Sequence, residues 1–118
     1  MKKILVIVRA SPYGGIRARE AIDAALLFSA FAPEIAVLFS GDGVWQLVAG
    51  QEPGGIGAKS VAATLGAFES YDIDRVYADA EALAARGIDT AHLLAGAQPV
   101  DAAGLRELLC SHDRVVTF

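Results

Sequence analysis

Cysteine and histidine are almost absent from this chain of 118 residues, which holds one cysteine, Cys110, and two histidines, His92 and His112. A single thiol excludes a disulfide within the chain. The histidines share no short motif with each other or with Cys110, so the ligand spacing of a metal site is missing. We therefore expect no bound metal and no other cofactor, and we interpret both histidines as structural or surface residues.

Basic runs and long apolar segments are missing as well. The ten lysines and arginines are scattered and the net charge is −4, so direct binding of nucleic acid through a basic patch is not expected. No apolar run approaches the ~18 residues of a membrane span, so no membrane partner is expected. The apolar start Ile4–Val8 is short for a signal peptide and no clear cleavage site follows it. Because nothing marks the chain for export, we expect a cytoplasmic protein.

Apolar residues, in contrast, are in surplus: they make up 54% of the chain, and the mean hydropathy is +0.44. Many fall in a predicted helix from about Ile16 to Ala32, which is apolar around most of its circumference from Ala24 onward. A helix packed on a sheet needs an apolar stripe only ~100° wide, so we expect a partner subunit to cover the remainder. An alanine-rich composition that inflates the hydropathy is the alternative interpretation. The candidate contact residues on this helix are Leu26, Phe28 and Phe31.

Strand-like and helical segments alternate along the chain, and no composition break divides residues 1–118, so we expect a single domain. The predicted strands are Lys3–Val8, Ile35–Phe39, Ile73–Ala78, His92–Ala95 and Arg114–Phe118. Helices are predicted at about 16–32, 44–48, 58–69, 81–86 and 101–111, the last with Asp101 as its N-cap. This alternation predicts an α/β fold of three layers, α/β/α, with a five-stranded, mainly parallel sheet.

The ends of the predicted strands carry the candidate functional residues. The stretch Ser40–Gln51 follows the second strand, at the carboxyl edge of the sheet, where open α/β sheets bind ligands and partners. It contains a tight Asp-Gly turn and the only tryptophan, but no nucleophile and no cluster of metal ligands. We therefore interpret it as a recognition surface. Its candidate interface residues are Asp42, Val44, Trp45 and Gln46.

Two further residues allow both a catalytic and a structural interpretation. Asp79 follows the third strand and could join Asp42 in acid–base work, although capping of the next helix explains it more simply. Cys110 lies off the apolar face of the last helix and near its C-terminus, where the helix dipole disfavours a thiolate. Arg106 and His112 could partly offset this effect. Cys110 is kept as a minor thiol candidate, and no residue is assigned as catalytic.

Short blocks along the whole chain resemble the TusC/DsrF family of sulfur-relay subunits. The most specific block is Asp-Gly-Val-x-Gln-Leu-x-x-Gly-Gln at residues 42–51. The other blocks follow in the order expected for the family: Ser11–Gly14, Arg19–Leu27, Tyr71–Ile73, Arg86–Asp89 and His112–Phe118. The resemblance implies a DsrE-like α/β fold and a part in passing persulfide sulfur between proteins.

The resemblance also implies partners. In the Tus version, three related subunits form a hexamer that supports 2-thiolation of the wobble uridine of tRNA, and in the Dsr version the homologous complex serves sulfur oxidation. The expected partners are thus TusB/DsrH-like and TusD/DsrE-like subunits. The sulfur-carrying cysteine belongs mainly to the TusD/DsrE-like sister, just after a central strand. The comparable stretch here, Val76–Asp79, has no cysteine, so no catalytic role passes to Cys110.

These observations favour a non-catalytic structural subunit of a sulfurtransferase complex, with tRNA thiolation as the leading process and a DsrF-type part in sulfur oxidation as the alternative. Two other classes stay open. One is a self-standing thiol enzyme that uses Cys110. The other is a homo-oligomeric protein that binds a small ligand outside any relay.

Overall fold

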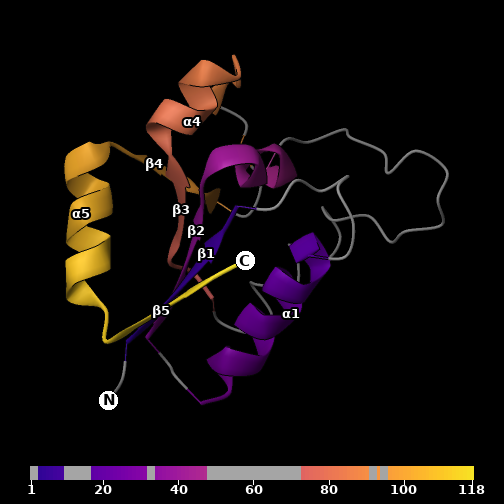
Figure 1. The fold of residues 1–118 in the computed structure, drawn as a ribbon, viewed down its shortest axis with the longest axis vertical. Helices are drawn as coiled ribbons and strands as arrows, with labels where there is room; N and C mark the ends of the chain where they lie inside the picture. Colours follow the sequence, from indigo (N-terminus) through magenta and orange to yellow (C-terminus); the bar gives the residue numbers. More distant parts are fainter. Residues whose placement is uncertain (1–2, 10–16, 32–33, 48–72, 91–92, 94–95) are drawn as a thin grey trace, which may run out of the picture.

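A five-stranded parallel sheet forms the centre of the computed structural model (Figure 1). The structure describes residues 3–9, 17–31, 34–47, 73–90, 93 and 96–118. The strands are β1 (Ile4–Val8), β2 (Ile35–Phe39), β3 (Val76–Asp79), β4 (Gln98–Val100) and β5 (Arg114–Thr117). They lie in the order β4-β3-β2-β1-β5, and every neighbouring pair is parallel. The predicted α/β class and the five-stranded parallel sheet are confirmed.

The central strands are apolar along their whole length because both of their faces are covered. All five residues of β2 are buried, and β1 is the similar run Ile-Leu-Val-Ile-Val. Such continuous apolar runs are typical of parallel strands between two layers of helices. The register aligns Ile4 with Ile35 and Val8 with Phe39, so β1 and β2 end together at the carboxyl edge of the sheet.

The connecting helices lie on both sides of this sheet. They are α1 (Arg17–Ser29), the 3-10 helix η1 (Gly41–Leu47), α4 (Ala80–Ala85) and α5 (Ala102–Ser111). Figure 1 shows α1 and α5 on opposite sides of the strands. One apolar cluster joins Ile22 of α1 to Val6 and Phe39, and a second joins Leu108 of α5 to Leu5 and Leu38. The predicted three layers are therefore present. No helix in the described part of the chain is long and apolar enough to span a membrane.

The fourth strand differs from its prediction. We predicted it at His92–Ala95, a segment that lies mostly outside the described residues, whereas β4 is Gln98–Val100 and pairs with β3. An edge strand makes ladder hydrogen bonds on one side only, so it tolerates a proline, which has no N–H. The strand that pairs with β3 is thus a short segment, Gln98–Val100, that we had not predicted as a strand.

Other boundaries move by a few residues. The third strand begins at Val76 rather than at Ile73, although Ile73 is buried in the core. The helix predicted at 44–48 is η1, which begins three residues earlier, at Gly41. The helix predicted at 58–69 lies outside the described residues. Asp101 caps α5 as predicted, since its carboxylate accepts a hydrogen bond from Gly104 N at 2.8 Å.

Candidate functional site

Within the predicted recognition stretch, Gly41–Leu47 forms η1, which is held directly against the end of β1, and residues 48–51 lie outside the described residues. Ser40 N donates to Val8 O at 3.0 Å, and Gly43 N donates to Ser40 O at 2.9 Å. Gly43 approaches the strand so closely that a Cβ built on it would lie 2.0 Å from Val8 O. Only glycine fits this contact. The turn therefore depends on an intimate backbone contact between β1 and η1.

The four interface candidates of this stretch divide between core and surface. Val44 and Gln46 are buried, and Val44 belongs to the same apolar cluster as Ile22 and Phe39. They therefore have almost no area to offer a partner and instead hold η1 in place. Asp42 is exposed and Trp45 is half-buried. Of the four candidates, only Asp42 and Trp45 have side-chain surface exposed at this edge of the sheet.

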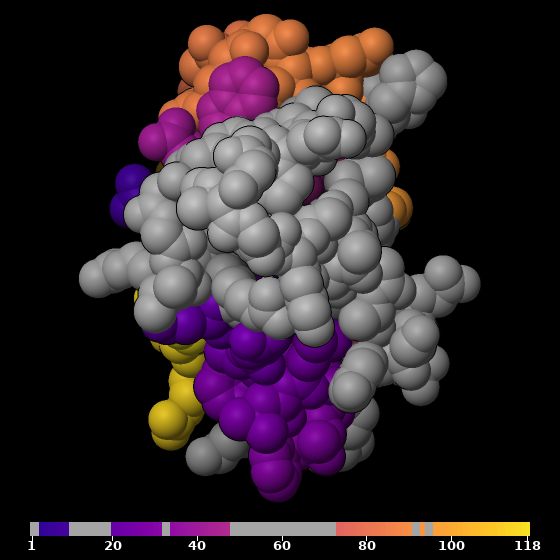
Figure 2. Space-filling view, turned by 90° about the vertical axis from the view of Figure 1, so that its right-hand side faces the viewer, coloured from indigo at the N-terminus to yellow at the C-terminus, as the bar shows by residue number. Residues whose placement is uncertain are grey.

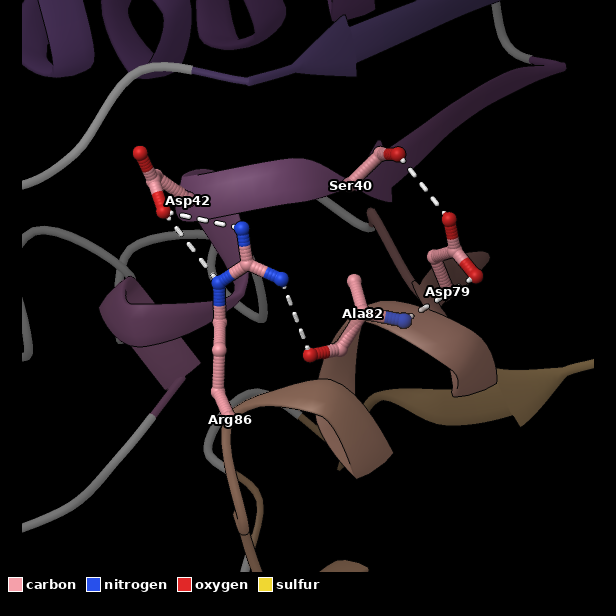
Figure 3. A network of polar contacts seen from close by, with 5 residues as sticks. All are labelled: Ser40, Asp42, Asp79, Ala82 and Arg86. Atoms are coloured by element: carbon pink, nitrogen blue, oxygen red, sulfur yellow. Dashed lines mark hydrogen bonds and ion pairs between the residues drawn. The ribbon is translucent and has the colours of Figure 1, made fainter.

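Asp42 is tied to α4 by Arg86 (Figure 3). The Arg86 Nε and Nη2 atoms donate to Asp42 Oδ1 at 3.2 and 2.9 Å, and Nη1 donates to Ala82 O at 3.1 Å. The Asp42 side chain is 62% exposed, so the ion pair contributes less than about 1 kcal/mol to stability. The role of the ion pair is to hold η1 beside α4. It also connects two of the blocks that carry the family resemblance, at residues 42–51 and 86–89. No local pattern in the sequence marks Arg86 on its own as a site residue.

Asp79 is the N-cap of α4, as its structural interpretation predicts. Its Oδ1 accepts hydrogen bonds from Glu81 N at 3.0 Å and Ala82 N at 3.4 Å. Its other oxygen accepts a hydrogen bond from the Ser40 hydroxyl at 3.1 Å (Figure 3). An N-cap of this kind is worth about 1 kcal/mol. Asp79 and Asp42 thus have separate partners, and the structure gives the pair no shared proton site for acid–base work.

The surface of α1 is the second candidate. Leu26 and Phe28 are only partly buried, but they pack against the core cluster that contains Ile22. Phe31, just beyond the helix, is 77% exposed, and Leu27, one helical turn before it, is 62% exposed. The exposed pair is therefore Leu27 and Phe31, which we call the α1 patch. Leu27 lies four residues after the charged Asp23, so the two side chains share one face of the helix. This spacing indicates from the sequence that Leu27 faces solvent.

Figure 2 shows part of the same surface. In this view α1, in purple, covers the lower part of the molecule, and residues of η1 and α4 lie beside each other at the opposite end. The structure thus places the two sets of candidates apart on the molecule. One lies at the carboxyl edge of the sheet and the other on the helix that covers one of its faces.

Cys110 lies in the last turn of α5 and is exposed. Its neighbour His112 is buried and already has partners. The His112 ring donates from Nδ1 to Leu108 O at 2.6 Å, and its Nε2 lies 3.3 Å from Nη2 of Arg75. Because a guanidinium only donates hydrogen bonds, Nε2 is the acceptor and Nδ1 carries the proton. This arrangement confirms the structural interpretation of His112. His92 lies outside the described residues.

Among the described residues, no group of three or more His, Cys, Asp or Glu side chains could hold a metal ion. The geometry of the described residues instead offers two surfaces for a partner. The first contains Asp42 and Trp45 at the carboxyl edge, and the second is the α1 patch. Neither contains a nucleophile.

Comparison with known proteins places this geometry in a family. A family model described as the DsrE/DsrF-like family matches residues 2–118. The chain is 39% identical over 118 residues to the Protein TusC homolog of Vibrio parahaemolyticus serotype O3:K6 (strain RIMD 2210633), and the match covers 100% of both chains.

Two solved structures share the fold. The ychN protein from E. coli has a TM-score of 0.85 at 22% identity, with 100% of both chains covered. The conserved protein of unknown function BT1422 from Bacteroides thetaiotaomicron has a TM-score of 0.68 at 13% identity, with 98% of this chain and 95% of that one covered. Since the family model and the TusC homolog both span essentially the whole chain, this protein belongs to the DsrE/DsrF-like family.

Proposed function

We propose that this chain is a non-catalytic structural subunit of a sulfur relay, in which protein-bound persulfide sulfur passes from one cysteine to the next. The process we favour is the relay that supports 2-thiolation of the wobble uridine of tRNA, because the chain is similar over its whole length to a TusC homolog. In such a relay an acceptor thiolate attacks the outer sulfur of a persulfide, the S–S bond breaks, and the donor leaves as a thiolate.

The end of β3 carries this proposal. The family resemblance places the sulfur-carrying cysteine of the sister subunit just after a central strand. The comparable stretch here, Val76–Asp79, has no cysteine. Its last residue, Asp79, caps α4 with its carboxylate and accepts a hydrogen bond from Ser40. The only thiol, Cys110, belongs to α5 and does not lie at a strand end. The chain therefore offers the fold of the relay subunits without a thiol at that place.

Its proposed partners are TusB/DsrH-like and TusD/DsrE-like subunits, joined in a hetero-hexamer. Two features support contact with other subunits. The α1 patch exposes large apolar side chains that a partner would remove from water. Asp42 and Trp45 offer a charged and an aromatic group at the carboxyl edge, where a partner's cysteine would be shielded and presented.

A Cys110→Ser variant tests the proposal. The serine keeps the size of an exposed side chain, so we expect the variant to fold, to assemble and to transfer sulfur within twofold of the unchanged protein. The measurement is persulfide transfer by the complex reconstituted with its partner subunits. The matched control removes the sulfur-carrying cysteine of the TusD/DsrE-like subunit and should abolish transfer. A loss of tenfold or more on Cys110→Ser would show that this chain carries sulfur itself.

A further inference from the structure

The two edges of the sheet are built differently. At one edge, β4 contains Pro99, which lacks a backbone N–H and so blunts the edge against pairing with another strand. At the other edge, β5 is the run Arg-Val-Val-Thr, rich in β-branched residues. Val115 is 40% exposed. Of the two edges, β5 is therefore the one suited to pairing with a further strand.

The direction of the β5 backbone groups follows from its pairing with β1. Arg114 N donates to Lys3 O at 3.2 Å and Phe118 N donates to Ile7 O at 2.9 Å. Because N–H and C=O groups of successive residues alternate in direction along a strand, Val116 also faces β1. The N–H and C=O groups of Val115 and Thr117 then face away from the sheet. The outer edge of β5 thus presents two donors and two acceptors.

We propose that a second copy of this chain binds at this edge, with the two β5 strands antiparallel about a two-fold axis at Val116. This placement sets Val115 of each copy opposite Thr117 of the other copy, which gives two such pairs. Both residues carry outward-facing backbone groups, so each pair exchanges two hydrogen bonds, four in total. Pairs of β-branched residues facing each other across strands are favourable. The edge is therefore complementary to itself.

Charge placement is compatible with the same arrangement. Arg114 is the only charged residue of β5, and the two-fold axis sets it opposite Phe118 of the second copy. The two Arg114 residues lie two positions from the axis on opposite sides, about 14 Å apart along the strands at roughly 3.4 Å per residue. This separation exceeds a Debye length of about 8 Å in physiological salt. Like charges therefore do not oppose the pairing.

The proposed pairing is independent of the proposed sulfur relay, because it follows from the backbone groups and the side chains of β5. The β5 edge would be a third contact surface, beside the carboxyl edge and the α1 patch. One pair of four-residue strands buries little area compared with the roughly 1,200 Å² or more of a stable interface. We therefore expect the pairing to be weak for the isolated chain and to be strengthened wherever other subunits hold two copies together. A test by covalent trapping suits such a contact.

The test places a cysteine at Val116 in the Cys110→Ser background, which removes the native exposed thiol. In the proposed register, residue 116 faces itself across the axis as a non-hydrogen-bonded pair, with Cα atoms about 4.5 Å apart. That distance is within reach of a disulfide. The matched control is Val115→Cys, whose Cα would lie roughly 8 Å from its own copy, beyond that reach.

Under mild oxidation we expect Val116→Cys to give at least tenfold more disulfide-linked dimer than Val115→Cys. Adding Thr117→Pro to the Val116 variant removes an outward N–H and should reduce its dimer by a similar factor. Circular dichroism of each variant establishes that it is folded. Equal dimer yields at positions 115 and 116, or no dimer at 116 from the folded variant, would overturn the proposed pairing.

Discussion

Replacing Gly43 by alanine is expected to prevent this chain from folding stably. The added Cβ would lie 2.0 Å from Val8 O and 2.8 Å from Val8 C, both backbone atoms. Val8 ends β1, which is paired with β2 on one side and with β5 on the other. The strand cannot retreat without breaking these ladders, so η1 would have to leave and lose its hydrogen bond from Ser40 N to Val8 O. We expect a loss of more than about 4 kcal/mol, a large share of a stability of roughly 5–15 kcal/mol.

Gly41→Ala is the matched control, because it adds the same methyl group two residues earlier in the same turn. Gly41 has a φ of +53°, which strains an alanine, but the nearest atom to its Cβ position is Arg9 Nε at 3.8 Å. The expected cost is the conformational one alone, about 1–2 kcal/mol. Urea denaturation followed by circular dichroism measures both variants. Equal losses would mean that the close contact between Gly43 and Val8 is not what holds η1.

A double substitution of the α1 patch, Leu27→Glu with Phe31→Glu, is expected to abolish assembly with the proposed partner subunits while leaving this chain folded. Leu27 is 62% exposed and Phe31 is 77% exposed, so each change should alter the free energy of unfolding by less than about 0.5 kcal/mol. In the assembly, two buried apolar contacts would become two buried carboxylates. We expect the affinity for partner subunits to fall at least 100-fold, about 2.7 kcal/mol at 1.36 kcal/mol per factor of ten.

The control for added charge is Ala102→Glu with Ala103→Glu, on the first turn of α5, where both side chains are exposed and acidic groups suit the helix dipole. This variant should assemble normally. Sedimentation velocity of each variant mixed with the partner subunits gives the assembled fraction. Unchanged assembly of the Leu27 and Phe31 variant would remove the α1 patch from the interface.

The parts of the fold that depend on local sequence could be predicted. The unbroken apolar runs of β1 and β2 indicate buried parallel strands, and both lie within or at the predicted bounds. Asp79 and Asp101 cap the following helices as expected, since an N-cap acts over two or three residues. The strand β4 could not be placed in this way. It has three residues, one of them Pro99, and it is a strand only because β3 pairs with it.

The candidate site was less predictable, because it depends on contacts between distant segments. Asp42 meets Arg86 across 44 positions of the sequence, and no local pattern reports such a contact. The sequence of η1 also does not reveal which side of a 3-10 turn faces the core. Val44 and Gln46 were expected at an interface, yet they are buried. On α1, Phe28 is held by the core cluster, so the exposed partner of Phe31 is Leu27.

In the proposed function, sulfur passes beside this chain and not through it. Intact-mass spectrometry of the reconstituted complex, after loading with a persulfide donor, measures directly which subunit carries the sulfur. We expect an added sulfur atom on the proposed TusD/DsrE-like partner and none on this chain, whose only thiol is Cys110. An added sulfur on Cys110 that then moves to the acceptor protein would contradict the proposed function.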